Sequence, residues 1–224
     1  MTNKEKYAEF CKKENTVPIF SQPWWLDAVC GENNWDVILV ENGDQIEAVM
    51  PFYSKKYFAF NIITMPPLTQ TLGPWLSSPI SDKYFNIISR EKKLLTQLIK
   101  GLPDFDYFAQ HFNNKITNWL PFYWNGFSQT TRYSYIINDL SDPEKVFSEF
   151  SHAKRKNIKK AKNLVDIRSD MDVVQFYDHH KNSLRKEGKN ISYSFDLLQK
   201  IFEATHKQNA GKTFYAVDKN NIIH

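Results

Sequence analysis

The sequence predicts a mixed α/β fold in which helices alternate with antiparallel hairpins. In the first half, helical patterns precede the hairpin pattern "WDVILVENGDQIEAVMPFY". In the second half, two amphipathic helices precede "KTFYAVDKNNIIH", which begins another hairpin. The same order of elements thus occurs twice, which favours two copies of one α/β unit over a single sandwich. We place the first domain at residues 1–138 and the second at residues 139–224.

The N-terminal elements follow from local signals. Residues 4–13 are expected to form a short helix. Ser21 is a candidate N-cap, and Pro23 suits the first turn of a helix that ends at Gly31. The runs "WDVILVEN" and "QIEAVMPFYSKK" flank the turn residues "GD", which predicts a hairpin.

The rest of the first half predicts further strands and helices. "AFNIITMPPLTQTLGPWL" contains an apolar strand followed by a proline-rich loop. Apolar residues recur at helical spacing from Phe85 to Leu98, and Gly101 closes that helix. "DFDYFAQHF" and "SQTTRYSYIINDL" are predicted strands, and "ITNWLPFYWNGF" is a predicted short helix.

The second half begins with "DPEKVFSEF", a predicted helix with Asp142 as its N-cap and Pro143 in its first turn. A basic helix, "SHAKRKNIKKAKN", comes next, then the strand "LVDIRSD" and two helices that each end at a glycine. The last strand, "IIH", stops after three residues. We therefore expect a chain truncated inside its second domain, with a short edge strand at a natural terminus as the alternative.

Composition limits the classes of function. Aromatic residues make up 15% of the chain, enough for a large core, so a disordered protein is not expected. The net charge is only +4, so any basic function must be local. Cys11 and Cys30 form no CxxC motif, which favours free thiols in a reducing compartment, although one disulfide is possible. Without an apolar signal segment or a membrane span, we expect a cytoplasmic protein.

Three segments carry a resemblance to a known family. They are "FSQPWWLDAV" with the hairpin after it, "ITMPPLTQTLGPWL", and "INDLSDPEKVFSEFSHAKRKNIKKAKN". Together they resemble the Fem-type peptidoglycan aminoacyltransferases and the FemAB-like branch of the GNAT (N-acetyltransferase) superfamily. The resemblance covers nearly the whole chain.

The resemblance implies tandem GNAT-like domains, the second truncated at its C-terminus. It also implies an acyl donor, either acyl-CoA or aminoacyl-tRNA. In a GNAT domain the pyrophosphate of acyl-CoA binds after the hairpin with which this chain ends. In the first domain, "QTLGPW" has one glycine, and Pro74 removes an N–H donor, so it matches a phosphate-binding loop poorly.

The basic stretch from Ser151 to Asp170 contains seven Lys and Arg residues. On a helix, Lys156, Lys159, Lys160 and Asn163 share one side. A solvated helix face is the first interpretation. The second is substrate binding, with Arg155 or Lys159 holding a phosphate or carboxylate of a nucleotide-linked glycan or of a tRNA acceptor end. No helix-turn-helix pattern surrounds the stretch, so DNA binding is not expected, and too few large apolar residues face the charges for a membrane helix.

An aromatic cleft is the second candidate site. Trp24, Trp25, Trp75 and Gln70 could line a cleft that stacks on a sugar or a peptide stem. The alternative is that Trp24 or Trp25 covers the core of the sheet. From these two sites we take Trp24, Trp25, Gln70, Arg155 and Lys159 as candidate substrate-binding residues.

No residue pattern predicts a metal site or a catalytic nucleophile. His179 and His180 are adjacent on a predicted helix, so their side chains diverge and make poor co-ligands. No G-x-S-x-G motif is present. Acyl transfer to an amine requires mainly positioning and removal of one proton, so no catalytic base can be named from sequence.

The sequence thus predicts a protein resembling acyl- or aminoacyl-transferases that acts on an amine of a cell-envelope or polysaccharide precursor. As a truncated chain it is expected to be inactive alone. The alternatives are a non-catalytic module that binds a glycan or peptide, and an interaction protein whose aromatic cleft packs against a partner.

Overall fold

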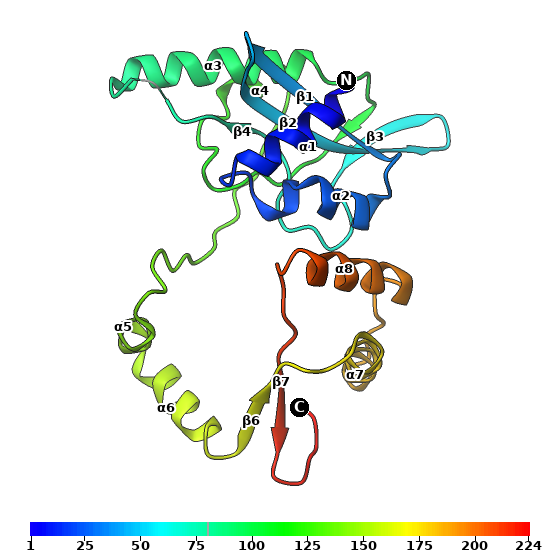
Figure 1. Cartoon of the computed structure of the whole chain (residues 1–224), viewed down its shortest axis with the longest axis vertical. Coiled ribbons are helices and arrows are strands. Elements are labelled where there is room, and N and C mark those ends of the chain that lie inside the picture. Colours follow the sequence, from blue (N-terminus) through cyan, green and yellow to red (C-terminus); the bar gives the residue numbers. More distant parts are fainter. Residues whose placement is uncertain (80) are drawn as a thin grey trace. The chain divides into compact units, whose positions relative to one another are not determined.

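The computed structural model describes residues 1–79 and 81–224 (Figure 1). The chain divides into two compact units. Unit 1 comprises residues 1–128 and 192–208, and unit 2 comprises residues 129–191 and 209–224. Helices and strands are mixed along the chain, which confirms the mixed α/β class. The division into tandem domains at residues 1–138 and 139–224 stays a prediction.

A mixed sheet forms the centre of unit 1. The predicted hairpin is confirmed, with β1 (Trp35–Asn42) antiparallel to the long strand β2 (Gln45–Tyr57). Two segments pair with the other edge of β2: β3 (Phe60–Thr64) along its end and the short β4 (Trp75–Leu76) nearer its start. β5 (Tyr107–Phe108) runs parallel to β3, so the strand predicted in "DFDYFAQHF" is present over only two residues.

The two faces of this sheet are buried in separate cores because side chains alternate along a strand. On β1, Trp35 and Val37 join the first core, whereas Ile38 and Val40 join the second. Helices α1 (Asn3–Lys13) and α2 (Pro23–Cys30) supply the first core, and α3 (Tyr84–Lys100) and α4 (Leu120–Trp124) supply the second. The sheet is thus covered by helices on both faces (Figure 1).

The helices of unit 1 begin and end close to the predicted positions. They are α1 (Asn3–Lys13), α2 (Pro23–Cys30), α3 (Tyr84–Lys100), α4 (Leu120–Trp124) and α8 (Phe195–Lys207), with a 3₁₀ turn at Ile19–Ser21. The predicted N-cap Ser21 is wrong, because Gln22 occupies that position. Ser21 instead ends the 3₁₀ turn, and its carbonyl accepts a hydrogen bond from the buried Tyr7 hydroxyl at 2.6 Å.

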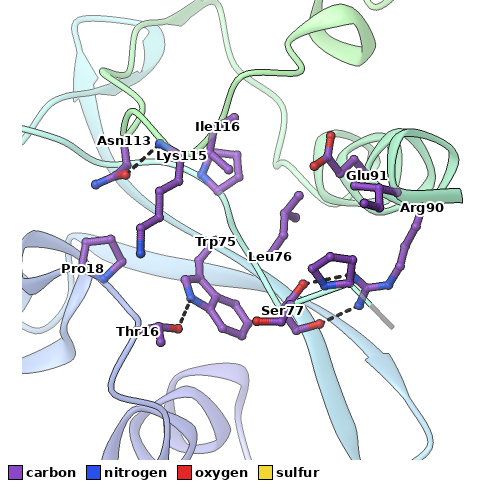
Figure 2. Close-up of a pocket in the computed structure, with 14 residues that line it drawn as sticks. Thr16, Pro18, Trp75, Leu76, Ser77, Arg90, Glu91, Asn113, Lys115 and Ile116 are labelled. Carbon is purple, nitrogen blue, oxygen red and sulfur yellow. Dashed lines mark hydrogen bonds between the residues drawn. The ribbon is translucent and has the colours of Figure 1, made fainter. Parts of the chain in front are cut away.

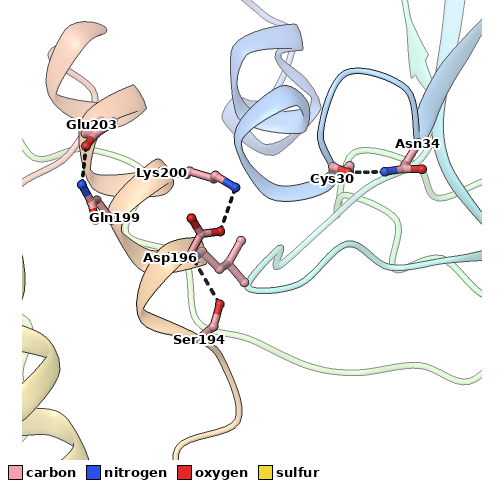
Figure 3. Close-up of polar contacts among 8 residues, drawn as sticks. Cys30, Asn34, Ser194, Asp196, Gln199, Lys200 and Glu203 are labelled. Atoms are coloured by element: carbon pink, nitrogen blue, oxygen red, sulfur yellow. Dashed lines mark hydrogen bonds and ion pairs between the residues drawn. The ribbon is translucent and has the colours of Figure 1, made fainter.

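Helix α8 packs against α2 although more than 160 residues separate them. Leu197 and Ile201 lie four residues apart, on one face of α8, and both contact the first core. Ser194 caps the helix by accepting the N–H of Leu197 at 3.2 Å. Figure 3 shows this start of α8 near the turn at Cys30 and Asn34. Helix α8 thus belongs to unit 1, whereas α7 (Val173–Lys186) belongs to unit 2.

Unit 2 contains the elements predicted for the basic region. They are α5 (Pro143–Glu149), α6 (His152–Ala161), β6 (Val165–Arg168), α7 (Val173–Lys186) and β7 (Tyr215–Asp218). Asp142 and Asp172 cap α5 and α7 through their carboxylates. β6 and β7 form an antiparallel pair, and Val217 of β7 also forms an isolated antiparallel bridge with Ile223.

One predicted strand is wrong. Residues 128–140, which carry "SQTTRYSYIINDL", contain no regular element and are exposed throughout. Tyr133 and Tyr135, on one side of the extended segment, are 95% and 103% exposed, and Ile136, on the other side, is 58% exposed. An extended segment becomes a strand only when a neighbour accepts its backbone hydrogen bonds, and this segment has no partner among the described strands.

Candidate functional site

Three of the residues predicted to line an aromatic cleft lie where α2 meets the proline-rich loop of residues 65–74: Trp24, Trp25 and Gln70. Trp25 is only 7% exposed and belongs to the first core. Its indole N–H donates to the Thr69 hydroxyl at 3.1 Å, which ties the loop to α2. Trp24 is half-buried and packs edge-on against Trp25, with ring centroids 5.9 Å apart. Gln70 follows Thr69 directly and is exposed.

Contacts at both ends hold this loop in place. The Leu72 N–H donates to the carbonyl of His111 at 2.8 Å, which joins the loop to the segment after β5. The Thr69 hydroxyl also donates to the Pro67 carbonyl at 3.0 Å. Gln70 is therefore an exposed amide on a constrained loop, with Trp24 as the accessible ring of the neighbouring pair.

Trp75, predicted for the same cleft, lines a different hollow (Figure 2). Its indole N–H donates to the Thr16 hydroxyl at 2.9 Å. This hollow has a volume of about 260 Å³, near the lower limit for a small-molecule pocket. Its walls are mainly apolar, and its charged lining residues are Arg90, Glu91 and Lys115.

Two of these three charges already have partners in the protein. Arg90 forms an ion pair with Glu47 at 3.2 Å and donates to the carbonyl of Ser77 at 3.0 Å. The Glu91 carboxylate accepts from Asn118 at 3.3 Å. Figure 2 shows the Lys115 side chain extending between Pro18 and Trp75. The hollow therefore offers one exposed ammonium beside an aromatic ring.

The basic stretch forms the other hollow, within unit 2. It lies between α5 and α6, has a volume of about 460 Å³, and is lined by Glu144, Phe147, Ser148, His152, Arg155, Lys156 and Lys159. The four basic lining residues occupy positions i, i+3, i+4 and i+7 of α6, so they share one face of that helix. We call this site, defined by the seven residues above, the basic hollow.

Arg155 connects the two helices of the basic hollow. Its guanidinium donates to the carbonyl of Ser148, near the end of α5, at 2.9 Å. Ser151 caps α6 by accepting the N–H of Lys154. Among the described residues that line the hollow, Glu144 is the only acid, so cations dominate its charge. Such a site favours an anion, and Arg155 retains further N–H donors for a phosphate or carboxylate.

The structure brings together some of the predicted basic residues and not others. Arg155 and Lys159 both line the basic hollow, together with Lys156. Lys160 and Asn163, predicted on the same side as Lys156, do not line it. His152 and Phe147 were not among the residues predicted from the sequence. His152 could have been found, because it precedes Arg155 by three residues and so lies on the same face of the helix. Phe147 could not be found in this way, because it belongs to a different helix, α5.

Several groups in the described part of the chain have shifted pKa values. Burial raises the pKa of the Cys11 and Cys30 thiols to about 12, and both cysteines are free. Burial also raises the pKa of Tyr7 well above its ordinary value. In unit 2 the Tyr215 hydroxyl donates to Asp170 at 2.6 Å, a hydrogen bond that lowers the pKa of Asp170 and raises that of Tyr215. At neutral pH the tyrosines and cysteines therefore stay protonated and Asp170 stays ionised. A general acid or base works best with a pKa near the operating pH, so these shifts do not favour proton transfer at neutral pH.

Among residues 1–79 and 81–224, no group of three or more His, Cys, Asp or Glu side chains is arranged to hold a metal ion. Within the same residues, no helix has the length and apolar character needed to span a membrane.

Comparison with known proteins identifies the fold. No family model matches the chain, and no curated protein matches it in sequence. Among solved structures, the crystal structure of FemX matches with a TM-score of 0.57 at 11% sequence identity. The chain has a FemX-like fold. The match covers 96% of this chain and 56% of the FemX chain, so this chain spans little more than half of the FemX length.

The match to FemX extends over parts of both units, because it covers 96% of the chain. The loop near Trp24 lies in unit 1, and the basic hollow lies in unit 2. At this identity the likeness concerns the fold alone and assigns no role to a residue. The roles of Trp24, Trp25, Gln70, Arg155 and Lys159 stay predictions.

Proposed function

We propose that this chain is part of a Fem-type acyl- or aminoacyl-transferase that passes an acyl group to an amine of a cell-envelope or polysaccharide precursor. The observation that carries the proposal is the FemX-like fold over 96% of the chain. The donor is aminoacyl-tRNA or acyl-CoA, and the acceptor is a nucleotide-linked glycan or its peptide.

The basic hollow is the anion-binding part of this proposed site. Arg155 and Lys159 hold a phosphate, because a guanidinium offers paired N–H donors and an ammonium adds a point charge. Phe147 supplies an apolar wall next to them. The same chemistry suits the pyrophosphate of a nucleotide-linked sugar and the phosphate backbone of a tRNA acceptor end.

Trp24 and Gln70 form the proposed glycan-binding part. An accessible indole presents a flat apolar face that stacks on a sugar ring, and an exposed amide donates to and accepts from sugar hydroxyls. Trp25 supports this part from beneath, since its ring is buried and holds the loop through Thr69.

Calorimetric titration of the protein with UDP and with UDP-N-acetylglucosamine tests the proposal. The double variant Arg155→Gln with Lys159→Gln is expected to weaken both ligands by tenfold or more, because each charge-assisted hydrogen bond contributes about 1.5–3 kcal/mol. Trp24→Ala is expected to weaken only the sugar-bearing ligand. The matched control is Lys154→Gln, which removes one charge from the same helix outside the basic hollow.

A transfer assay then separates the enzyme from its alternative. The protein is incubated with labelled aminoacyl-tRNA or acetyl-CoA and an amine-bearing precursor, and mass spectrometry follows the acceptor. Ligand binding without transfer from either donor would favour the non-catalytic glycan- or peptide-binding module. An absence of binding to both UDP ligands would contradict the proposed role of the basic hollow.

A further inference from the structure

The hairpin between β2 and β3 ends in an unusual surface. Its last paired residues and its loop read Tyr57-Phe58-Ala59-Phe60, and all four are exposed. Tyr57, Phe58 and Phe60 are 61%, 86% and 56% exposed. Four consecutive exposed apolar residues are unfavourable in water unless they have a function, since a tight turn ordinarily carries polar residues or glycine.

A sheet face extends this aromatic surface. Lys55 pairs with Ile62, and Tyr57 pairs with Phe60, so these side chains point to the same side of the sheet. Tyr107 of the parallel neighbour β5 is paired with Ile62 and is 57% exposed. We call the surface made by Tyr57, Phe58, Phe60 and Tyr107 the aromatic tip.

Positive charge lies directly behind the aromatic tip. Lys55 and Lys56 are both exposed and immediately precede Tyr57. The acids on the neighbouring segment are Asp104 and Asp106, and the Asp106 carboxylate already accepts the backbone N–H of Asn61 at 2.7 Å. The hairpin end therefore combines exposed rings with two lysines, of which Lys55 lies on the face of Tyr57 and Phe60 and Lys56 on the opposite face.

The backbone at Phe58 supports a functional origin for this surface. Phe58 has φ of 54°, in the left-handed region that bulky residues rarely adopt. Phe58 is the first of the two loop residues between the paired Tyr57 and Phe60. When φ is positive at this position of a two-residue hairpin loop, glycine is favoured over larger residues. A strained, exposed phenylalanine at this position points to a contact outside the molecule.

We propose that the aromatic tip docks on an anionic membrane surface. Aromatic rings partition to the boundary between lipid headgroups and acyl chains, and lysines beside them attract anionic headgroups. The charges decide between possible occupants, because a second copy of the tip would place Lys55 and Lys56 against like charges. The contact lies in the interface plane and requires no spanning segment.

Co-sedimentation with lipid vesicles tests the proposal. The protein is expected to pellet with vesicles of phosphatidylcholine and phosphatidylglycerol at low salt, and much less with phosphatidylcholine alone or at high salt. Phe58→Asn with Phe60→Ser is expected to lower the partition coefficient on the order of tenfold or more. Lys55→Gln with Lys56→Gln is expected to lower it on the order of 30-fold, from the typical effect of two lysines at an anionic surface.

Two matched controls assign any binding to the tip. Tyr133→Ser with Tyr135→Ser removes two exposed rings elsewhere, and Lys154→Gln with Lys162→Gln removes two charges from the basic stretch. Both are expected to pellet like the unaltered protein, and circular dichroism checks that every variant is folded.

Three outcomes would overturn the proposal. The first is no pelleting with anionic vesicles at low salt. The second is an equal loss in a tip variant and its matched control, which would indicate general charge or general hydrophobicity. The third is a concentration-dependent dimer, seen by sedimentation velocity, that the Phe58→Asn and Phe60→Ser changes abolish, which would assign the tip to a second copy of the chain.

Discussion

We expect helix α8 to stabilise unit 1, although most of unit 1 lies more than 60 residues earlier in the chain. Residues 129–191, which immediately precede α8 in the sequence, should gain little stability from it. Its side chains Leu197 and Ile201 are half-buried against the first core. In that core, Leu26 of α2 is fully buried and Val29 is 6% exposed. The test is the double variant Leu197→Ala with Ile201→Ala, which keeps helix propensity and removes the packing.

The magnitude follows from burial. A fully buried Leu or Ile truncated to Ala costs about 2–5 kcal/mol, and these two side chains are about half-buried, so each should cost about 1–2 kcal/mol. Because they lie one turn apart and share one core, their effects are coupled, and we expect about 2–4 kcal/mol together. That is a large part of the stability of an ordinary domain, which is about 5–15 kcal/mol.

Hydrogen exchange followed by mass spectrometry locates this loss. Peptides that cover α2 should lose protection in the double variant by the same free energy. The matched control is Gln199→Ala with Glu203→Ala, an exposed pair on α8 joined by a 2.9 Å hydrogen bond, which should change stability by about 0.5 kcal/mol or less. If α2 keeps its protection while residues 129–191 lose theirs, α8 belongs with the second half, and the packing described for unit 1 is refuted.

Three further predictions concern single residues. Burial raises the pKa of the Cys11 and Cys30 thiols to about 12, so the stability that the protonated thiols contribute is present below about pH 8.5 and is lost as pH rises towards 12. The urea concentration at the midpoint of unfolding should therefore fall over that pH range. At pH 8, iodoacetamide should label the native protein on the order of 100–1,000 times more slowly than the unfolded protein, because the buried thiols are protonated. Phe58→Gly should leave the free energy of unfolding unchanged or raise it by up to about 1 kcal/mol, because glycine adopts a positive φ without strain. A melting temperature clearly below that of the unaltered protein would show that the backbone at Phe58 is not strained. Arg90→Ala should cost about 1–3 kcal/mol in urea unfolding, because it leaves the Glu47 carboxylate and the Ser77 carbonyl unpaired, and Arg90→Lys should restore little, because an ammonium cannot reproduce the guanidinium fork.

Elements set by local signals were predictable from the sequence. The β1–β2 hairpin follows from alternating apolar residues around a Gly-Asp turn, and its inward side chains divide between the two cores as alternation requires. The caps at Asp142 and Gly31 also stand where the sequence placed them. Each of these features depends on residues within a few positions of one another.

Features that depend on distant partners were not predictable. The segment of residues 128–140 has the alternation of a strand but no neighbour to pair with among the described strands. Ser21 has the chemistry of an N-cap, but its carbonyl is engaged by Tyr7, fourteen positions earlier in the chain. The amphipathic pattern of α8 predicted a buried face without indicating that α2 would cover it.

The candidate sites divide in the same way. Charge density alone indicated Arg155 and Lys159, and helical periodicity would have added His152. Phe147 and Ser148 could not be found from α6, because they enter the basic hollow only when α5 packs beside it. Lys115 and Arg90 meet at the second hollow from separate segments, and neither carries a motif.

Two surfaces of this protein depart from what folding alone would select, and they do so for different reasons. The basic hollow gathers cations on one helix face with a single acid, which costs repulsion that a mixed-charge surface would avoid. The aromatic tip exposes rings at a turn and holds Phe58 in a left-handed conformation. Departures from local rules are most informative where no structural gain offsets them, since such positions are retained for a contact with something else. Because the two surfaces share no residue, the variants that test phosphate binding and those that test membrane docking are independent, and either proposal can fail without weakening the other.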